Sequence, residues 1–234
     1  MSRTGSNRRI LQTGRAVHMV LELQEEKGNK ATLLLDGAAY CRCYRKDLRS
    51  AGIAEGEEVD EAVLDRFNRE VLLPRAKRRS LFLLNRKRYT AQEMRKKLTA
   101  DGYPGEVVEE TLSYLQELRY IDDVSYAQGY ALSLLPRCSE RELCQKMLQR
   151  GFEKELVAEA IKEAQKEYSL ENGGGEAEYE LPELSAIRAY LRKKGYQPEQ
   201  ATQEKKKKVI AALYRRGFSL SDIRKVIGET EEME

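Results

Sequence analysis

The chain has 234 residues, of which 35% are charged and 41% hydrophobic, with 5 prolines and no tryptophan. A composition rich in Lys, Arg, Glu and Leu predicts a mainly helical protein. No apolar run is long enough for a membrane span and the N-terminus has no apolar signal segment, so we expect a cytoplasmic protein without a membrane partner. The net charge of +3 hides a strong segregation of charge along the chain, and this segregation bears on the choice of partners.

The first part of the chain alternates in a way that is typical of strands. Residues 1–14 are polar and basic, and we expect a disordered tail. From Val17 onward apolar and polar residues alternate, the Asp36-Gly37 pair signals a hairpin, and a third strand is expected over 39–44. Residues 15–73 are therefore predicted to form a small antiparallel β meander followed by a helix. Acidic residues at 57–61 indicate the start of that helix.

The helical part of the chain contains clear signals for the start and for the end of helices. Pro74 is expected to restart the helix, whose buried stripe we predict to be Leu81, Phe82 and Leu84. Thr90-Ala-Gln-Glu93 is a capping box, in which the threonine hydroxyl and the glutamate each satisfy a free backbone amide. Gly102 supplies the positive φ that ends this second helix.

The same unit then recurs twice. Three stop glycines, each followed by an aromatic residue, fall in register: Gly102, Gly151 and Gly217. Four and eight residues before each glycine, apolar residues recur, and the apolar positions after the glycines also match. A second capping box, Ser139-Glu-Arg-Glu142, repeats the first. Helical periodicity explains the apolar matches, but not their coincidence with the glycine, the aromatic residue and the cap.

We therefore predict three tandem three-helix units in an elongated array behind the β meander. Their boundaries are placed at 74–123, 124–168 and 184–229, with a flexible linker or insert at 169–183 and an acidic tail at 230–234. The third unit is expected to contain a long basic helix over 199–216.

Catalytic chemistry is not indicated. The sequence has one histidine, no phosphate-binding glycine loop and no nucleophile motif, so we predict no enzyme and no cofactor. Asp122-Asp123 is interpreted as the cap of a helix that starts at Val124, in preference to a metal or acid–base pair. The 4 cysteines lack zinc-site spacing and are expected to be reduced thiols.

Basic side chains are the best candidates for function. Between Arg75 and Leu98 stand ten Lys or Arg residues against one acid, Glu93. A charge run is usually a solvated face, but cations that few acids offset repel one another, and an anionic partner would relieve this repulsion. The candidate binding residues of the first unit are Arg86, Lys87, Arg88, Tyr89, Arg95, Lys96 and Lys97, with Tyr89 as a stacking candidate. Those of the other two units are Arg141, Lys146, Arg150, Lys205, Lys206, Arg215 and Arg216.

The chain resembles the RecX family of recombination regulatory proteins. The resemblance rests on RKRYTAQEMRKKL, LRYIDDVSYA, SERELCQKMLQRGF and KKKKVIAALYRRGFSLSDIRKVI, and it spans residues 75–229. It implies a monomeric cytosolic modulator that binds the filament of a RecA-type recombinase on single-stranded DNA. Such a modulator restrains, and mostly inhibits, filament growth, ATP hydrolysis, strand exchange and co-protease activity.

A second hypothesis belongs to another class. Paired helices with a basic second member also describe helix-turn-helix modules, so the chain could be a free-standing DNA-binding protein. Steeply salt-dependent binding to bare DNA would favour this alternative, whereas activity that depends on the filament would favour the regulator.

Overall fold

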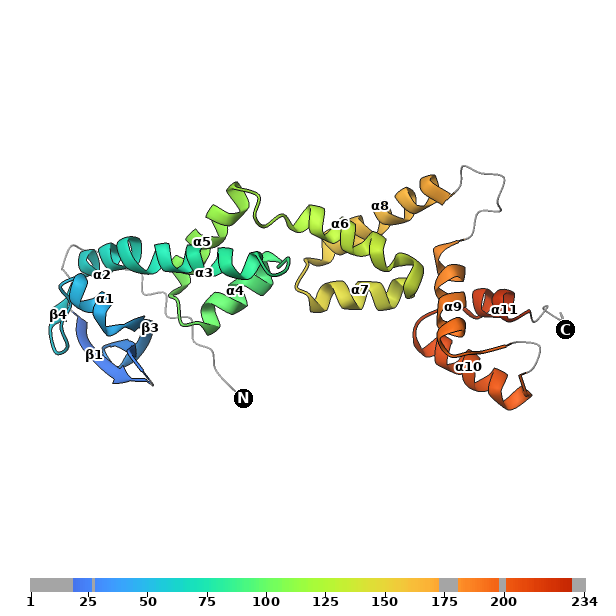
Figure 1. The fold of residues 1–234 in the computed structure, drawn as a ribbon, viewed down its shortest axis with the longest axis horizontal. Helices are drawn as coiled ribbons and strands as arrows, with labels where there is room; N and C mark the ends of the chain where they lie inside the picture. The colour runs from blue at the N-terminus through green and yellow to red at the C-terminus, as the bar shows by residue number, and fades with distance from the viewer. Residues whose placement is uncertain (1–18, 27, 173–180, 198–200, 229–234) are drawn as a thin grey trace. The chain divides into compact units, whose positions relative to one another are not determined.

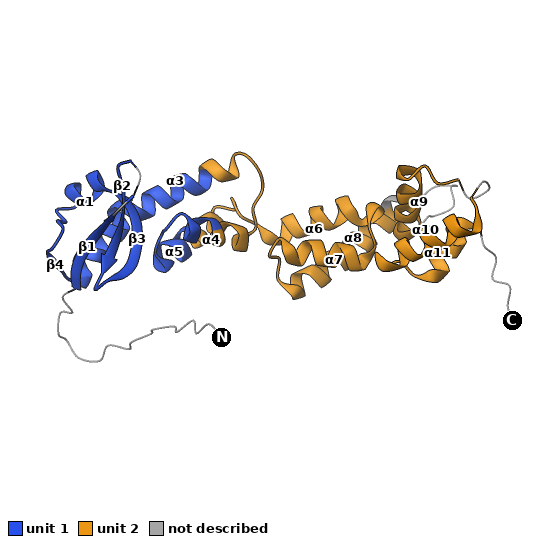
Figure 2. Cartoon of the chain, turned by 90° about the horizontal axis from the view of Figure 1, so that it is seen from below, with its two compact units in different colours: residues 1–81, 97–111 blue, residues 82–96, 112–234 orange. Residues whose placement is uncertain are grey.

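The protein is represented by a computed structural model that describes residues 19–26, 28–172, 181–197 and 201–228 (Figure 1). The predicted tail 1–14, the strand start at Val17, residues 173–180 of the predicted linker and the tail 230–234 lie outside the described residues. The chain divides into two compact units. Unit 1 comprises residues 1–81 and 97–111, and unit 2 comprises residues 82–96 and 112–234 (Figure 2).

Unit 1 contains a four-stranded antiparallel sheet with the order β3-β2-β1-β4. Its strands are β1 (Met19–Glu25), β2 (Lys30–Leu35), β3 (Ala38–Tyr44) and β4 (Glu58–Val59). Leu21 pairs with Leu35, and alternate residues of β2 are buried, as the period-two pattern predicted. Asp36 and Gly37 both have positive φ, which a type I′ hairpin requires.

The predicted helix start at 57–61 is confirmed at its last residue, Glu61, and a strand that was not predicted precedes it. Glu58 and Val59 form β4, in which Val59 pairs with Met19 of β1. Helix α2 (Glu61–Phe67) begins after Asp60, whose carboxylate accepts a 2.8 Å hydrogen bond from the Val63 amide. The acids Asp60 and Glu61 lie at the helix N-terminus as expected. Pairing with a strand about 40 residues earlier, which no local pattern specifies, places Glu58 and Val59 in the sheet.

One continuous helical segment follows, because α2 passes through the π-helical turn η1 (Asn68–Leu72) into α3 (Leu73–Leu84). The Leu73 amide donates to the Asn68 carbonyl, five residues back. Pro74 has no amide hydrogen to donate, and the wider turn just before it lets the helix continue. Pro74 therefore lies inside a continuous helical segment and does not restart one.

The predicted stripe of α3 was also wrong. Phe82 is 52% exposed, whereas the buried residues of α3 are Leu73, Ala76, Ser80 and Leu83. These buried positions repeat at helical spacing, but they define a helix face one residue away from the predicted one. The apolar residues at 81–84 are adjacent, so they fit more than one face of a helix. The Ser80 hydroxyl is satisfied inside the helix by a 2.9 Å bond to the Ala76 carbonyl.

The remaining helices form the repeats. They are α4 (Ala91–Ala100), α5 (Gly105–Glu117), α6 (Asp123–Leu134), the 3-10 turn η2 (Leu135–Arg137), α7 (Glu140–Gln149), α8 (Lys154–Asn172), α9 (Pro182–Lys193), α10 (Gln203–Arg215) and α11 (Leu220–Ile227). Helices α6–α8 enclose one apolar core around Leu143 and Met147, and α9–α11 enclose another around Ile187 and Leu213. The expected helix start at 199 lies outside the described residues, and α10 begins at Gln203 after its cap Thr202.

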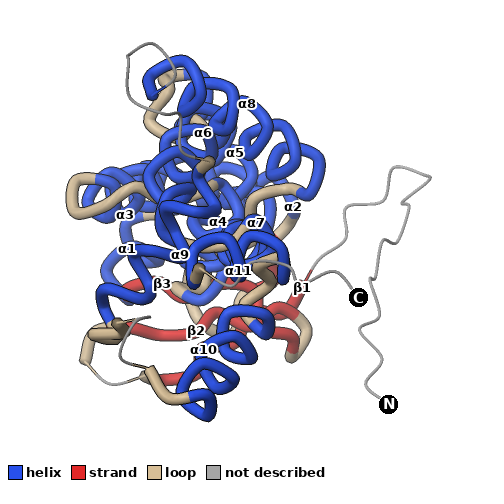
Figure 3. Tube along the Cα trace, turned by 90° about the vertical axis from the view of Figure 1, so that its right-hand side faces the viewer, coloured by secondary structure: helices blue, strands red, loops and turns tan. Residues whose placement is uncertain are grey.

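The three stop glycines adopt one geometry. Gly102, Gly151 and Gly217 have φ of 89°, 85° and 97°. Each glycine amide donates to the carbonyl three residues back, and the next amide donates to the carbonyl five residues back. This is the Schellman motif, which satisfies the last carbonyls of a helix. The structure confirms a mainly helical fold in which three-helix units follow an antiparallel sheet along the chain (Figure 3).

Candidate nucleic-acid interface and the joints between repeats

The basic loop, defined as Arg86, Lys87 and Arg88, lies between α3 and α4, and all three side chains are exposed. Each cation lies over an aromatic ring. The guanidinium of Arg86 is 4.5 Å from the Phe82 ring centroid, and the ammonium of Lys87 is 4.3 Å from that of Tyr89. Arg88 lies 4.6 Å from the ring centroid of Tyr126. These ring contacts hold the cations in place without neutralising their charge.

Within the residues that the structure describes, no carboxylate forms an ion pair with the basic loop. Three adjacent uncompensated charges repel one another, and phosphate groups would remove that repulsion. Tyr89, the predicted stacking residue, is half-buried, and the ammonium of Lys87 lies over its ring.

The other candidates of the first unit lie on α4. Arg95 is half-buried and donates a 3.0 Å hydrogen bond to the Gln92 side chain, whereas Lys96 and Lys97 are exposed. In the third repeat, Lys205 and Arg215 are exposed and Lys206 is half-buried, all on α10.

Two candidates, Arg150 and Arg216, take part in contacts between repeats. We call the first set of contacts joint 1, made by Thr90, Glu93, Arg150 and Gly151. The Thr90 hydroxyl accepts from the Glu93 amide at 3.0 Å, and the Glu93 carboxylate accepts from the Thr90 amide at 3.2 Å, so the predicted capping box is confirmed. The same hydroxyl donates 2.9 Å to the Arg150 carbonyl.

The side chain of Arg150 completes joint 1. Its guanidinium lies 4.0 Å from the Glu93 carboxylate and donates a 2.6 Å hydrogen bond to the Tyr126 hydroxyl. It also lies 4.7 Å from the ring centroid of Tyr130. The backbone of Gly151 packs directly on the Gln92 side chain, close enough that a methyl group on Gly151 would lie 2.8 Å from Gln92 Cγ.

Joint 2, made by Ser139, Glu142, Arg216 and Gly217, repeats the arrangement one unit later. The Ser139 hydroxyl accepts from the Glu142 amide at 3.2 Å and donates 2.5 Å to the Arg216 carbonyl. The Arg216 guanidinium donates twice to one oxygen of Glu142, at 2.9 and 2.7 Å. Glu142 also pairs with Lys146 at 2.9 Å, which places a third candidate in the joint. Arg141, whose Cβ lies against Gly217, remains exposed.

Sequence reasoning placed Arg150 and Arg216 among ligand-binding residues and did not foresee the joints. The signal was present, since an Arg-Gly pair in one unit recurs with a Ser/Thr-x-x-Glu cap in the preceding unit. A hydroxyl that caps its own helix and also donates to the next repeat explains why the cap, the arginine and the glycine recur together.

The Asp122-Asp123 pair has two separate structural roles. Asp122 caps α6 by accepting a 2.9 Å hydrogen bond from the Ser125 amide, which confirms the predicted cap. Asp123 instead accepts from the Ala91 amide at 3.1 and 3.2 Å, at the start of α4. Burial raises the pKa of Asp123, and the amide bond partly opposes that rise.

Joint 2 makes the free energy of unfolding depend on pH in the acidic range. Burial of Glu142 acts to raise its pKa, but bonds from Lys146 and Arg216 outweigh burial and hold the pKa below its ordinary 4.5. The stability from this group is therefore full above pH 4.5 and is lost as the pH falls through the lowered pKa. Below pH 4.5 we expect the free energy of unfolding to fall less steeply with decreasing pH in Glu142→Gln than in the parent protein. Urea denaturation at several pH values measures this difference. An identical acid dependence of Glu142→Gln and the parent would contradict this assignment.

Among residues 19–26, 28–172, 181–197 and 201–228, no group of three or more His, Cys, Asp or Glu side chains could hold a metal ion. Cys41, Cys43, Cys138 and Cys144 are free thiols. No helix in the described part of the chain is long and apolar enough to cross a membrane.

Together these features define a helical-repeat protein in which three-helix bundles follow a small sheet. The family descriptions "RecX, first three-helix domain" and "RecX, third three-helix domain" match residues 76–115 and 182–227. In these two segments the chain is similar to the RecX family of regulatory proteins.

Relatives and a solved structure show the same similarity over a larger part of the chain. "Regulatory protein RecX" of Caldanaerobacter subterraneus is 25% identical over 209 residues, covering 89% of this chain and 97% of the relative. That of Levilactobacillus brevis is 27% identical, covering 87% of this chain and 72% of the relative. A crystal structure of regulatory protein RecX has the same fold, with a TM-score of 0.52 and 22% identity, covering 92% of this chain and 100% of that one.

Proposed function

We propose that this protein binds the filament that a RecA-type recombinase forms on single-stranded DNA, and that it restrains the filament by binding and not by catalysis. Similarity to a family of regulatory proteins supports a regulatory role. The observation that carries the binding proposal is the basic loop, whose three exposed cations have no carboxylate partner within the described residues.

The joints support the way in which binding would restrain the filament. In unit 2 they connect α4 to the second repeat and α7 to the third through hydroxyl, ion-pair and backbone contacts. A connected series of repeats can contact several successive recombinase subunits at once, and multivalent contact strengthens binding without any new type of interaction. We propose that the protein bridges recombinase subunits as a monomer and so slows filament growth and ATP turnover.

The test is the single-stranded-DNA-dependent ATP hydrolysis of the cognate recombinase, titrated with this protein. We expect suppression at well below one protein per recombinase subunit. In the variant Arg86→Gln/Lys87→Gln/Arg88→Gln, the concentration needed for half suppression is expected to rise about tenfold, because up to three phosphate groups no longer meet a cation. The slope of log affinity against log salt concentration should also fall by about one for each phosphate group that the variant no longer neutralises.

The matched control is Lys154→Gln/Lys162→Gln/Lys166→Gln, which removes the same charge from exposed positions of α8. It should suppress ATP hydrolysis like the parent protein. Suppression that begins only when the DNA itself is saturated would contradict the proposal and favour the free-standing DNA-binding protein. An equal loss in both triple variants would show that net charge matters and that the basic loop does not.

A further inference from the structure

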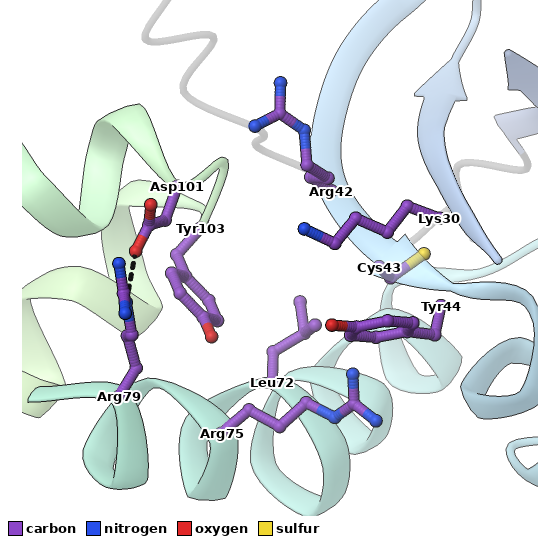
Figure 4. A pocket seen from close by; sticks show the side chains of 9 residues that line it. All are labelled: Lys30, Arg42, Cys43, Tyr44, Leu72, Arg75, Arg79, Asp101 and Tyr103. Atoms are coloured by element: carbon purple, nitrogen blue, oxygen red, sulfur yellow. Dashed lines mark hydrogen bonds and ion pairs between the residues drawn. The ribbon is translucent and has the colours of Figure 1, made fainter. Parts of the chain in front are cut away.

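A polar cavity lies within unit 1 and encloses about 300 Å³ (Figure 4). Strands β2 and β3 form one wall, the η1–α3 helix forms another, and the turn between α4 and α5 closes a third side. We call it the sheet–helix pocket, and its polar lining residues are Lys30, Arg42, Tyr44, Arg75, Arg79, Asp101 and Tyr103.

Cations outnumber carboxylates among the lining residues of the pocket. Of its four cations, Arg79 pairs with the lining carboxylate Asp101 at 2.7 Å. Arg42 and Arg75 pair with Glu26 at 2.8 Å and with Asp47 at 2.5 Å, outside the lining. A second cavity adjoins it, shares Tyr44 and Arg75, and adds three more cations with no carboxylate among its lining residues: Arg45, Lys46 and Arg49. Lys30 forms no ion pair within the described residues, although its charge helps to lower the pKa of Glu26. Cations gathered in a concave site raise the local concentration of anions.

The two tyrosines add donors to this site. Figure 4 shows the hydroxyl groups of Tyr44 and Tyr103 directed into the space that the cations surround. Burial raises the pKa of Tyr103, so its phenol stays protonated and can donate. The residues at the same position in the other two repeats, Phe152 and Phe218, are 3% and 2% exposed and have no hydroxyl. Only the first repeat therefore places a polar group here.

The pocket suits an oxyanion better than a flat base. Arg75 lies 4.7 Å and Lys30 5.8 Å from the ring centroid of Tyr44, so cations already occupy the positions above that ring where a base would stack. The polar groups left to line the cavity are ammonium, guanidinium and phenol donors. Guanidinium and ammonium groups are the side chains that proteins use most to bind phosphate.

We propose that the sheet–helix pocket binds a phosphate group, either of a single-stranded nucleic acid backbone or of a free polyphosphate. Lys30 and Tyr103 contact the phosphate oxygens, and the adjoining cavity takes the next phosphate. The residues of this site are not those of the basic loop. The phosphate-binding proposal therefore does not depend on the regulatory function proposed above.

The test compares Lys30→Gln/Tyr103→Phe with the matched control Arg66→Gln/Tyr214→Phe, which removes one charge and one hydroxyl at exposed positions that line neither cavity. Tyr103→Phe introduces the aromatic residue found in the other repeats, and Lys30 is exposed at the start of β2. Both changes should therefore leave the fold intact, which circular dichroism verifies.

Binding is measured with two probes, a labelled oligothymidylate by fluorescence anisotropy and inorganic tripolyphosphate by calorimetry. We expect about tenfold weaker binding in the pocket variant and parental binding in the control. A loss seen only with the oligonucleotide identifies a strand as the ligand, and a loss with tripolyphosphate identifies a free polyphosphate. Equal affinities of parent and pocket variant for both probes would overturn the proposal.

The parent, the pocket variant and the control variant are also measured with the three residues of the basic loop replaced by glutamine. This removes the contribution of the basic loop to binding. A pocket effect that persists in this background belongs to unit 1 and is independent of the filament assay. Amide chemical shifts of residues 42–44 and 101–103 on addition of tripolyphosphate give a second measurement. Unchanged shifts at saturating probe would equally overturn the proposal.

Discussion

Gly151→Ala is expected to lower the free energy of unfolding by about 2–3 kcal/mol. The residue has φ of 85°, a conformation that costs any residue with a Cβ about 1 kcal/mol. The added methyl group would also lie 2.8 and 2.9 Å from Cγ and Cβ of Gln92. Neither atom is the free end of a flexible chain, so the first joint must open slightly to admit the methyl group.

The matched control is Gly129→Ala. Gly129 lies inside α6 without positive φ, and a methyl group there would meet no atom within 4 Å. Alanine should stabilise the helix there by up to about 1 kcal/mol. Urea denaturation followed by circular dichroism measures both variants, and exchange of the Phe152 amide, which donates to the Met147 carbonyl, reports the turn at Gly151. A Gly151→Ala protein as stable as the parent would show that neither the backbone conformation nor the close packing constrains the joint.

Ser139→Ala is expected to cost about 2–3 kcal/mol, because one buried hydroxyl makes two bonds. Loss of the cap on α7 accounts for about 1 kcal/mol. The remainder comes from the Arg216 carbonyl, which loses the donor that lies 2.5 Å away in the parent protein.

Ser219→Ala separates these two contributions. Ser219 is exposed and caps α11 with a 3.1 Å bond from the Asp222 amide. Its hydroxyl also donates 2.6 Å to the Asp222 carboxylate, so both bonds stay within its own repeat. Its replacement should cost about 1 kcal/mol, the usual value for a cap. The difference between the two serine variants in urea denaturation then measures the bond across joint 2. Equal losses would mean that the hydroxyl-to-carbonyl bond contributes nothing.

Local sequence signals predicted the elements that depend on neighbouring residues. The hairpin at Asp36-Gly37, the cap at Thr90 and the stop at Gly102 each rest on the conformational or hydrogen-bonding preference of one or two side chains. The triplication was likewise visible, because each unit repeats the same local signals. By contrast, the phase of α3 was wrong because adjacent apolar residues at 81–84 fit more than one helical face.

The sequence by itself determined the class of fold, the helix ends marked by caps and stop glycines, and the uncompensated charge of the basic loop, because all of these depend on short stretches of chain. Only the tertiary structure decided what the recurring arginines do. Thr90 meets the Arg150 carbonyl across 60 residues and Ser139 meets that of Arg216 across 77, separations over which no local pattern specifies a partner. The same holds for β4 and for the sheet–helix pocket, since each needs segments brought together by packing.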